Sequence, residues 1–128
     1  MLTEVGDLTG NVFVGGTLTA LARVVDWANA LLVQSAVSTI TYTITDPSGS
    51  PVTGHNNVSL TIADVIFDTL QTSPAGLWTA DSTGFNFAHT IDISSNPAFA
   101  VTGTHVLQYV ITPTSAQPVL VRYSITAI

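Results

Sequence analysis

The chain has 128 residues, a net charge of −6 and 46% hydrophobic residues, a composition that favours one folded domain over disorder. Lys, Arg, Asp and Glu make up 8% of the sequence, against about 25% in typical soluble domains, and Arg23 and Arg122 are the only cations besides histidine. So few positive charges argue against binding to nucleic acid or to an anionic membrane surface.

The first ten residues, MLTEVGDLTG, lack the basic region and apolar block of a secretory signal. We therefore expect a protein made in a host cytoplasm. No run reaches the roughly 20 apolar residues of a membrane-spanning helix, and no cysteine is present for disulfide or thiolate chemistry. Residues 1–128 are expected to form a single domain, with residues 1–10 as an N-terminal arm that reaches neighbouring subunits.

Alternation of apolar and polar residues, the period of a β-strand, recurs through the first half of the chain. It predicts strands over residues 11–14, 17–25, 39–45 and 58–62. Residues 26–36 do not alternate and are expected to form a loop with about one helical turn. The stretch DPSGSPVTG predicts a turn, because proline fixes φ, glycine tolerates a positive φ, and Asp46 can accept hydrogen bonds from nearby amides.

The second half continues the same pattern. Residues 63–72 fit a strand or an irregular segment, and SPAGLW is expected to be a loop that delivers Trp78. Further strands are predicted over residues 85–93, 105–112 and 119–128. Seven or eight short strands separated by turns predict an all-β sandwich of two antiparallel sheets. The predicted core consists of Leu18, Val24, Ile40, Tyr42, Ile44, Leu60, Ile62, Trp78, Phe87, Ile91, Leu107, Tyr109, Ile111, Val121, Tyr123 and Ile125.

Two segments resemble immunoglobulin-like domains. WTADSTGFNFAHTI, from Trp78 to Ile91, is similar to the E–F region of such domains, and GTHVLQYVITP, from Gly103 to Pro113, is similar to their G-x-Y-x-V-x-I-x-P strand. The chain departs from antibody-type domains in having no cysteine pair. The resemblance implies an immunoglobulin-like β-sandwich of the kind found in tailed-phage virion proteins, where such modules lie on capsids, necks, tail tubes or baseplates.

No motif predicts catalysis. The histidines are dispersed and show no metal-ligand spacing: His55, His89 and His105. Asp64 and Asp68 are a carboxylate pair, which we interpret as solvated or turn-bonding aspartates rather than as glycosidic acid–base groups. Asp81 and Asn86 offer oxygens to calcium but lack the alternating acids of a dedicated loop. GNVFVGGT lacks the lysine of a phosphate-binding loop. We therefore expect no enzyme, metal or cofactor.

Aromatic residues leave a second interpretation open. A sugar-binding platform could draw on Trp27, Trp78, Phe85 and Tyr123. Trp27 lies in the non-alternating segment and is the one expected to be exposed, as a ligand-binding or interface aromatic. The alternative function is therefore a carbohydrate- or cell-surface-binding adhesion module.

Threonine on the predicted strand TITYTIT points to the main interpretation. Ile40, Tyr42 and Ile44 fall on one face, and the opposite face holds threonine without lysine or glutamate. Burying a hydroxyl costs less than burying an ion, and interface cores are depleted in charge. We therefore expect a homo-oligomeric structural subunit covered by copies of itself or by a larger scaffold. Its most concrete form is a capsid decoration, neck or tail component of a phage virion.

Overall fold

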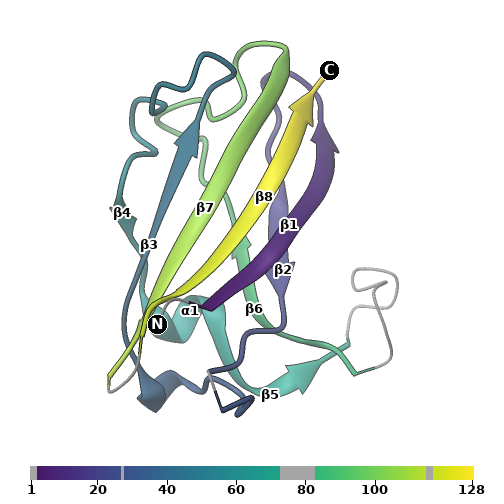
Figure 1. The fold of residues 1–128 in the computed structure, drawn as a ribbon. Helices are drawn as coiled ribbons and strands as arrows, with labels where there is room; N and C mark the ends of the chain where they lie inside the picture. The colour runs from purple at the N-terminus through teal and green to yellow at the C-terminus, as the bar shows by residue number, and fades with distance from the viewer. Residues whose placement is uncertain (1–2, 27, 73–82, 115–116) are drawn as a thin grey trace.

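The computed structural model describes residues 3–26, 28–72, 83–114 and 117–128 (Figure 1). Its elements in chain order are β1 (Thr3–Val12), β2 (Thr19–Ala22), the 3₁₀ turn η1 (Gln34–Ala36), β3 (Val37–Thr45), β4 (Val58–Ser59), α1 (Ile62–Val65), β5 (Ile66–Gln71), β6 (Phe85–Thr90), β7 (Gly103–Pro113) and β8 (Val119–Ala127).

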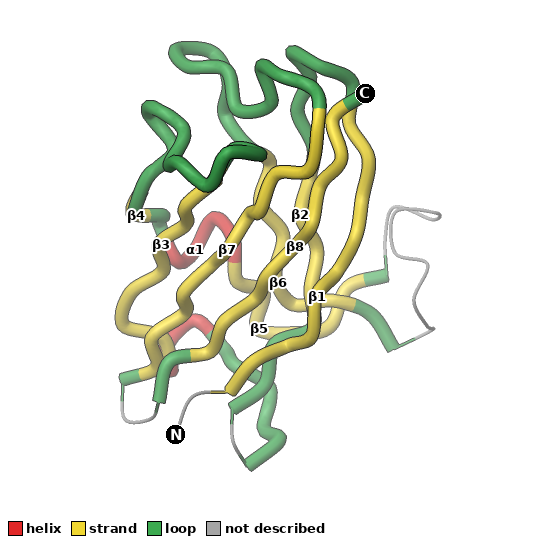
Figure 2. The backbone as a smooth tube through the Cα atoms, turned by 45° about the horizontal axis from the view of Figure 1, so that its top comes forward, coloured by secondary structure: helices red, strands yellow, loops and turns green. Residues whose placement is uncertain are grey.

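The strands form two sheets that face each other, as the tube in Figure 2 also shows. The larger sheet has the order β1-β8-β7-β3-β4, and the smaller one has the order β2-β6-β5. In β7 and β8 every second side chain is buried, as the period of two predicts for strands with one face on a core. The expected all-β sandwich is confirmed.

The N-terminal strand differs from expectation in extent and direction. A strand was expected over residues 11–14 only, but β1 begins at Thr3, so residues 3–10 lie in the sheet of their own chain. β1 pairs parallel with β8, from Thr3 beside Val119 to Val12 beside Ala127. The prediction of purely antiparallel sheets is therefore wrong at this edge. Alternation identifies a strand but carries no information about its direction relative to a partner.

The predicted core matches the buried interior closely. All of its members are buried except Leu18, Leu60 and Ile62, which are partly buried against it, and Trp78, which lies outside the described residues. Phe99, in the loop between β6 and β7, is also fully buried. A loop residue without alternating neighbours gives no periodic signal, so the sequence did not predict this burial.

Residues 58–72 differ in part from the strand expected over 58–62 and the strand or irregular segment expected over 63–72. The predicted strand over 58–62 is short, because β4 ends at Ser59 and the chain then leaves the larger sheet. The single turn of α1 leads into β5 of the smaller sheet, so this crossover uses a helical turn and then a strand. The helical turn expected within residues 26–36 is present as η1.

The turn after β3 forms as its sequence predicts. The Asp46 carboxylate accepts hydrogen bonds from the Ser48 and Ser50 amides, each at 3.0 Å, and from the Ser48 hydroxyl at 2.7 Å. Gly49 takes a φ of 89°, in the region that glycine favours. This turn fixes one wall of the pocket described below.

Candidate interaction surface

Four of the five strands of the larger sheet are almost free of charge. Strands β3, β4, β7 and β8 contain a single Lys, Arg, Asp or Glu residue, Arg122, whereas the edge strand β1 contains Glu4 and Asp7. The outward face of these four strands is made by side chains that point away from the core, and we call it the outer face. It comprises Thr39, Thr41, Thr43, Thr45, Ser59, Thr104, Val106, Gln108, Val110, Thr112, Leu120, Arg122, Ser124 and Thr126.

Strand register places these side chains in continuous rows. Thr41 lies beside Val110, which lies beside Leu120 on the next strand. One row along, Gln108 lies between Thr43 and Arg122. The three long strands β3, β7 and β8, at ordinary strand spacing and rise, span roughly 450 Å². That area is a little over half of the ~800 Å² that each partner contributes to a standard protein interface.

A tyrosine–histidine pair occupies the interior behind the outer face. The Tyr42 hydroxyl lies 2.7 Å from His55 Nδ1, and His55 Nε2 lies 2.9 Å from the Asn96 carbonyl oxygen. A carbonyl oxygen can only accept, so His55 Nε2 donates, and in the neutral ring Nδ1 accepts the Tyr42 hydroxyl proton. The pair therefore ties β3 to the turn before β4 and to the loop after β6.

A second such pair lies close by. His89 Nδ1 is 2.7 Å from the Tyr109 hydroxyl, and the His89 ring is 5.1 Å from the Tyr42 ring. Burial, followed by the positive charge that His55 can carry, lowers the pKa of His89. Burial raises the pKa values of Tyr42 and Tyr109, so both phenols are protonated and neutral at physiological pH. The rings of Tyr42, His89 and Tyr109 pack against one another in the interior.

Asn86 has a structural role that the sequence missed. Its side chain is fully buried, and its Oδ1 accepts the Val24 amide proton at 2.7 Å. Its Nδ2 donates to the carbonyls of Val24 at 3.0 Å and Leu32 at 2.9 Å. Of the two residues weighed for calcium, Asn86 therefore holds the interior together through its amide. Asp81, the other one, lies outside the described residues. The one sequence feature that could have indicated this role is that Asn86 is a polar residue between two phenylalanines.

The carboxylate pair and the histidines are not brought together as a site. Asp64 and Asp68 are exposed, and Asp68 Oδ1 accepts the Gln34 amide proton at 2.8 Å, which holds η1 beside β5. Within residues 3–26, 28–72, 83–114 and 117–128, no three His, Asp or Glu side chains are grouped to hold a metal ion. The helices of the same residues are all too short or too polar to cross a membrane.

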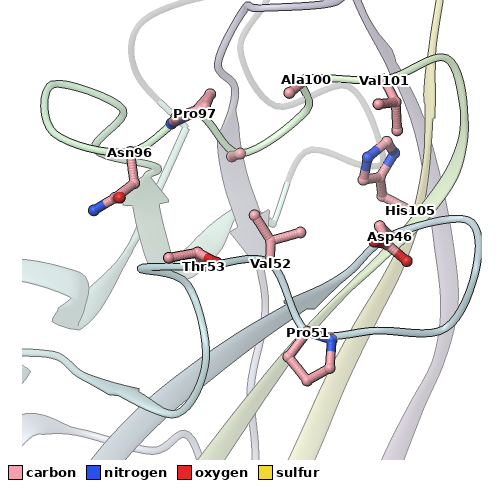
Figure 3. A pocket seen from close by; sticks show the side chains of 10 residues that line it. Asp46, Pro51, Val52, Thr53, Asn96, Pro97, Ala100, Val101 and His105 are labelled. Carbon is pink, nitrogen blue, oxygen red and sulfur yellow. The ribbon is translucent and has the colours of Figure 1, made fainter.

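A pocket of about 270 Å³ opens between the turn after β3 and the loop after β6 (Figure 3). Its lining is mainly apolar: Asp46, Pro51, Val52, Thr53, Asn96, Pro97, Ala98, Ala100, Val101 and His105. His105 is buried, with its ring edge-on to Phe99 at 5.2 Å, and its Nδ1 lies 3.3 Å from the Gly103 carbonyl oxygen. Sequence analysis did not predict this pocket, because its walls are 50 residues apart in the chain.

The four aromatic residues considered for a sugar-binding platform differ in where they lie in the structure. Trp27, the candidate ligand-binding or interface aromatic, and Trp78 lie outside the described residues. Phe85 and Tyr123 are buried, and the Tyr123 hydroxyl donates to the Leu21 carbonyl at 2.7 Å. These last two side chains therefore cannot form an exposed sugar platform. Among the described aromatic residues, Phe13 is the one that is largely exposed.

Comparisons with known proteins gave no match. A scan against protein-family models, a search of curated proteins and a search of solved structures each found nothing similar.

Proposed function

We propose that this protein is a non-enzymatic structural subunit of a multi-subunit assembly, in which the outer face is covered by copies of the chain or by a larger protein scaffold. The observation that carries the proposal is the outer face itself, a surface of threonine, serine, valine and leucine in which Arg122 is the single charged residue.

The physical argument rests on the cost of desolvation. In a free-standing sheet protein, charged residues, above all lysine, keep the surface soluble and prevent the sheet edges from pairing with another molecule. This sequence contains no lysine. Covering hydroxyls and β-branched side chains requires far less free energy than covering ions, so the composition of the outer face suits a contact better than permanent exposure to water.

The most specific form of the proposal is a phage virion protein, such as a capsid decoration, neck or tail component. The resemblance of residues 78–91 and 103–113 to immunoglobulin-like modules supports it. The grouping of β2, β6 and β5 in one sheet and of β3, β7 and β8 in the other is also compatible with the BED and CFG sheets of that fold. β1 differs, because it lies beside β8 rather than beside β2.

A single charge at the centre of the outer face tests the assembly role. Val110 lies between Thr41 and Leu120, so Val110→Lys places an ammonium group in the middle of the surface. We expect the purified wild-type chain to form oligomers in light scattering and electron microscopy, and the variant to remain folded but to dissociate. Ala63→Lys, at an exposed position on α1, is the matched control and should assemble normally. A wild-type chain that stays monomeric, or a Val110→Lys variant that assembles like wild type, contradicts the proposal.

Two further measurements separate the specific forms of the function. Immunogold labelling of purified phage particles from the source culture should decorate the particle if the chain is a virion protein. Retention of a monomeric chain on a polysaccharide matrix would instead favour the carbohydrate-binding module.

A further inference from the structure

The large hydrophobic side chains that the described residues expose gather at one end of the sandwich. Phe13 and Val14 follow β1, Val101 precedes β7 and Ile128 follows β8, and these strand ends meet where Figure 1 marks the C-terminus. Their exposed fractions are 76%, 41%, 52% and 62%, respectively. The Val14 amide donates to the Ile128 carbonyl at 3.0 Å, so the segments are direct neighbours. We call these four residues the end patch; it exposes roughly 400 Å², a size typical of functional patches.

The turn that carries Phe13 is rigidly built. Gly15 has a φ of 82°, and its amide donates to the Phe99 carbonyl at 2.9 Å. The Gly16 amide donates to the Phe13 carbonyl at 2.8 Å, and a Cβ at position 16 would come within 2.9 Å of that oxygen, so the tight turn requires glycine there. A fixed turn that presents an aromatic ring to solvent loses little conformational entropy when the ring is buried by a partner.

The pocket between the turn after β3 and the loop after β6 lies beside the end patch and shares Val101 with it. An apolar cavity of about 150 Å³ holds a benzene ring, so a pocket of about 270 Å³ admits a phenyl side chain. Asp46 is the single acid in the lining, and its Oδ1 already accepts hydrogen bonds from Ser48 and Ser50. The pocket therefore suits an apolar guest such as the ring of Phe13.

We propose that two copies of this chain dock end to end about a two-fold axis, with Phe13 of each copy in the pocket of the other. A projecting ring and a matching pocket on the same end of one molecule form a self-complementary surface, which is the requirement for a two-fold contact. α1 and β5, which carry the exposed Asp64 and Asp68, lie at the other end, so those acids stay apart in the dimer (Figure 1).

The buried area sets the expected strength of the contact. Two end patches remove at most roughly 800 Å² from water, and the pocket linings add a smaller area, which places the interface below the ~1,200 Å² lower limit of stable complexes and among weak, transient contacts. We therefore expect a reversible dimer with a dissociation constant in the micromolar range. The inference rests on the proposed function, because it names one contact within the proposed assembly.

Sedimentation velocity over a range of protein concentrations tests the contact. The wild-type chain should shift from monomer to dimer with concentration, whereas Phe13→Ser, which removes the ring, and Ala100→Trp, which fills the pocket from its own wall, should each weaken association by at least about tenfold. Ala63→Trp adds the same bulk at the opposite end and should dimerise normally. Near-ultraviolet circular dichroism shows whether each variant is folded.

Mixing the two defective variants gives the sharper result. Phe13→Ser keeps the pocket and Ala100→Trp keeps the ring, so one ring-in-pocket contact can form between them although neither variant pairs well with itself. A mixture that forms more dimer than either variant alone supports the proposal. A wild-type chain that is monomeric at all concentrations, variants that dimerise like wild type, or a mixture that associates no better than its components overturns it.

The two proposals fail in different ways. If Val110→Lys dissociates the assembly and Phe13→Ser does not weaken association, the proposed end-to-end contact is wrong and the proposed role of the outer face stands. If Phe13→Ser and Ala100→Trp remove dimers while Val110→Lys leaves every oligomer intact, the end contact stands and the proposed role of the outer face is wrong.

Discussion

At the scale of single residues, the polar groups of the interior are the main finding beyond the sequence pattern. Asn86 holds the chain at Val24 and Leu32 with three hydrogen bonds. His55 is buried although it lies between strands, where no alternation predicts burial. His105 is buried in phase with Leu107 and Tyr109 of β7, so its position in the strand places it in the interior.

His89 predicts a pH-dependent stability. Its pKa in the folded chain lies below the ordinary value of 6.5, because burial and the nearby His55 disfavour the charged ring. The unfolded chain therefore binds more protons, and the free energy of unfolding falls as pH drops below about 6.5. Urea denaturation between pH 7.5 and 5 should show this decline, and His89→Gln should reduce its slope.

Two aspartates give a separate pH dependence of stability, which lies at lower pH than that of His89. Hydrogen bonds from Ser48 and Ser50 lower the pKa of Asp46, and hydrogen bonds from Ser94 lower that of Asp92. Their stabilising effect is present above the ordinary pKa of 3.8 and is lost as pH falls below it, so it lies outside the pH range of the His89 measurement. Equal slopes for wild type and His89→Gln between pH 7.5 and 5 contradict the prediction.

At the scale of secondary-structure elements, two glycines with positive φ allow two stability costs of a Gly→Ala substitution to be compared. One is the cost of backbone strain alone, and the other is the cost of strain together with a steric clash. Gly84 directly precedes β6 and has a φ of 107°, and a Cβ there would collide with the backbone of Gln71 in β5. Gly49, in the turn after β3, has a φ of 89° but open space around the Cβ position. We expect Gly84→Ala to lower the free energy of unfolding by about 3 kcal/mol, and Gly49→Ala to lower it by about 1 kcal/mol.

Chemical denaturation of the two variants measures the difference. Because both substitutions place alanine at a positive φ, the excess loss in Gly84→Ala reports the close approach of β5 to β6. Equal losses in the two variants would mean that the strands separate at little cost. A larger loss in Gly84→Ala would indicate that the smaller sheet, which has short strands, depends on the close approach of the β5 and β6 backbones.

At the scale of the whole molecule, the distribution of charge predicts how assembly responds to salt. Each copy has a net charge of −6, while the outer face has one charged residue in its strands. Copies therefore repel at long range but form few ion pairs in contact. Raising the ionic strength from about 0.05 M to about 0.5 M screens the repulsion, so association should be unchanged or stronger. Light scattering measures this directly, and dissociation at high salt would indicate an interface of ion pairs instead.

The sequence by itself determined most of the strands and most of the core. The period of two in β3, β7 and β8, and the Asp, Pro and Gly residues of the turn after β3, act over a few residues and can be read locally. The uncharged side chains of the outer face were visible in the same way, because alternation assigns each residue of a strand to one of two faces.

Only the tertiary structure decided which strands are neighbours and where the candidate sites lie. The parallel pairing of β1 with β8 joins residues more than 100 positions apart. The pocket and the end patch likewise bring together the ends of β1 and β8 and the loops beside β3 and β7. Such contacts depend on how the two sheets close around a shared core, and the free energy that selects them is spread over long-range packing rather than encoded in any short segment.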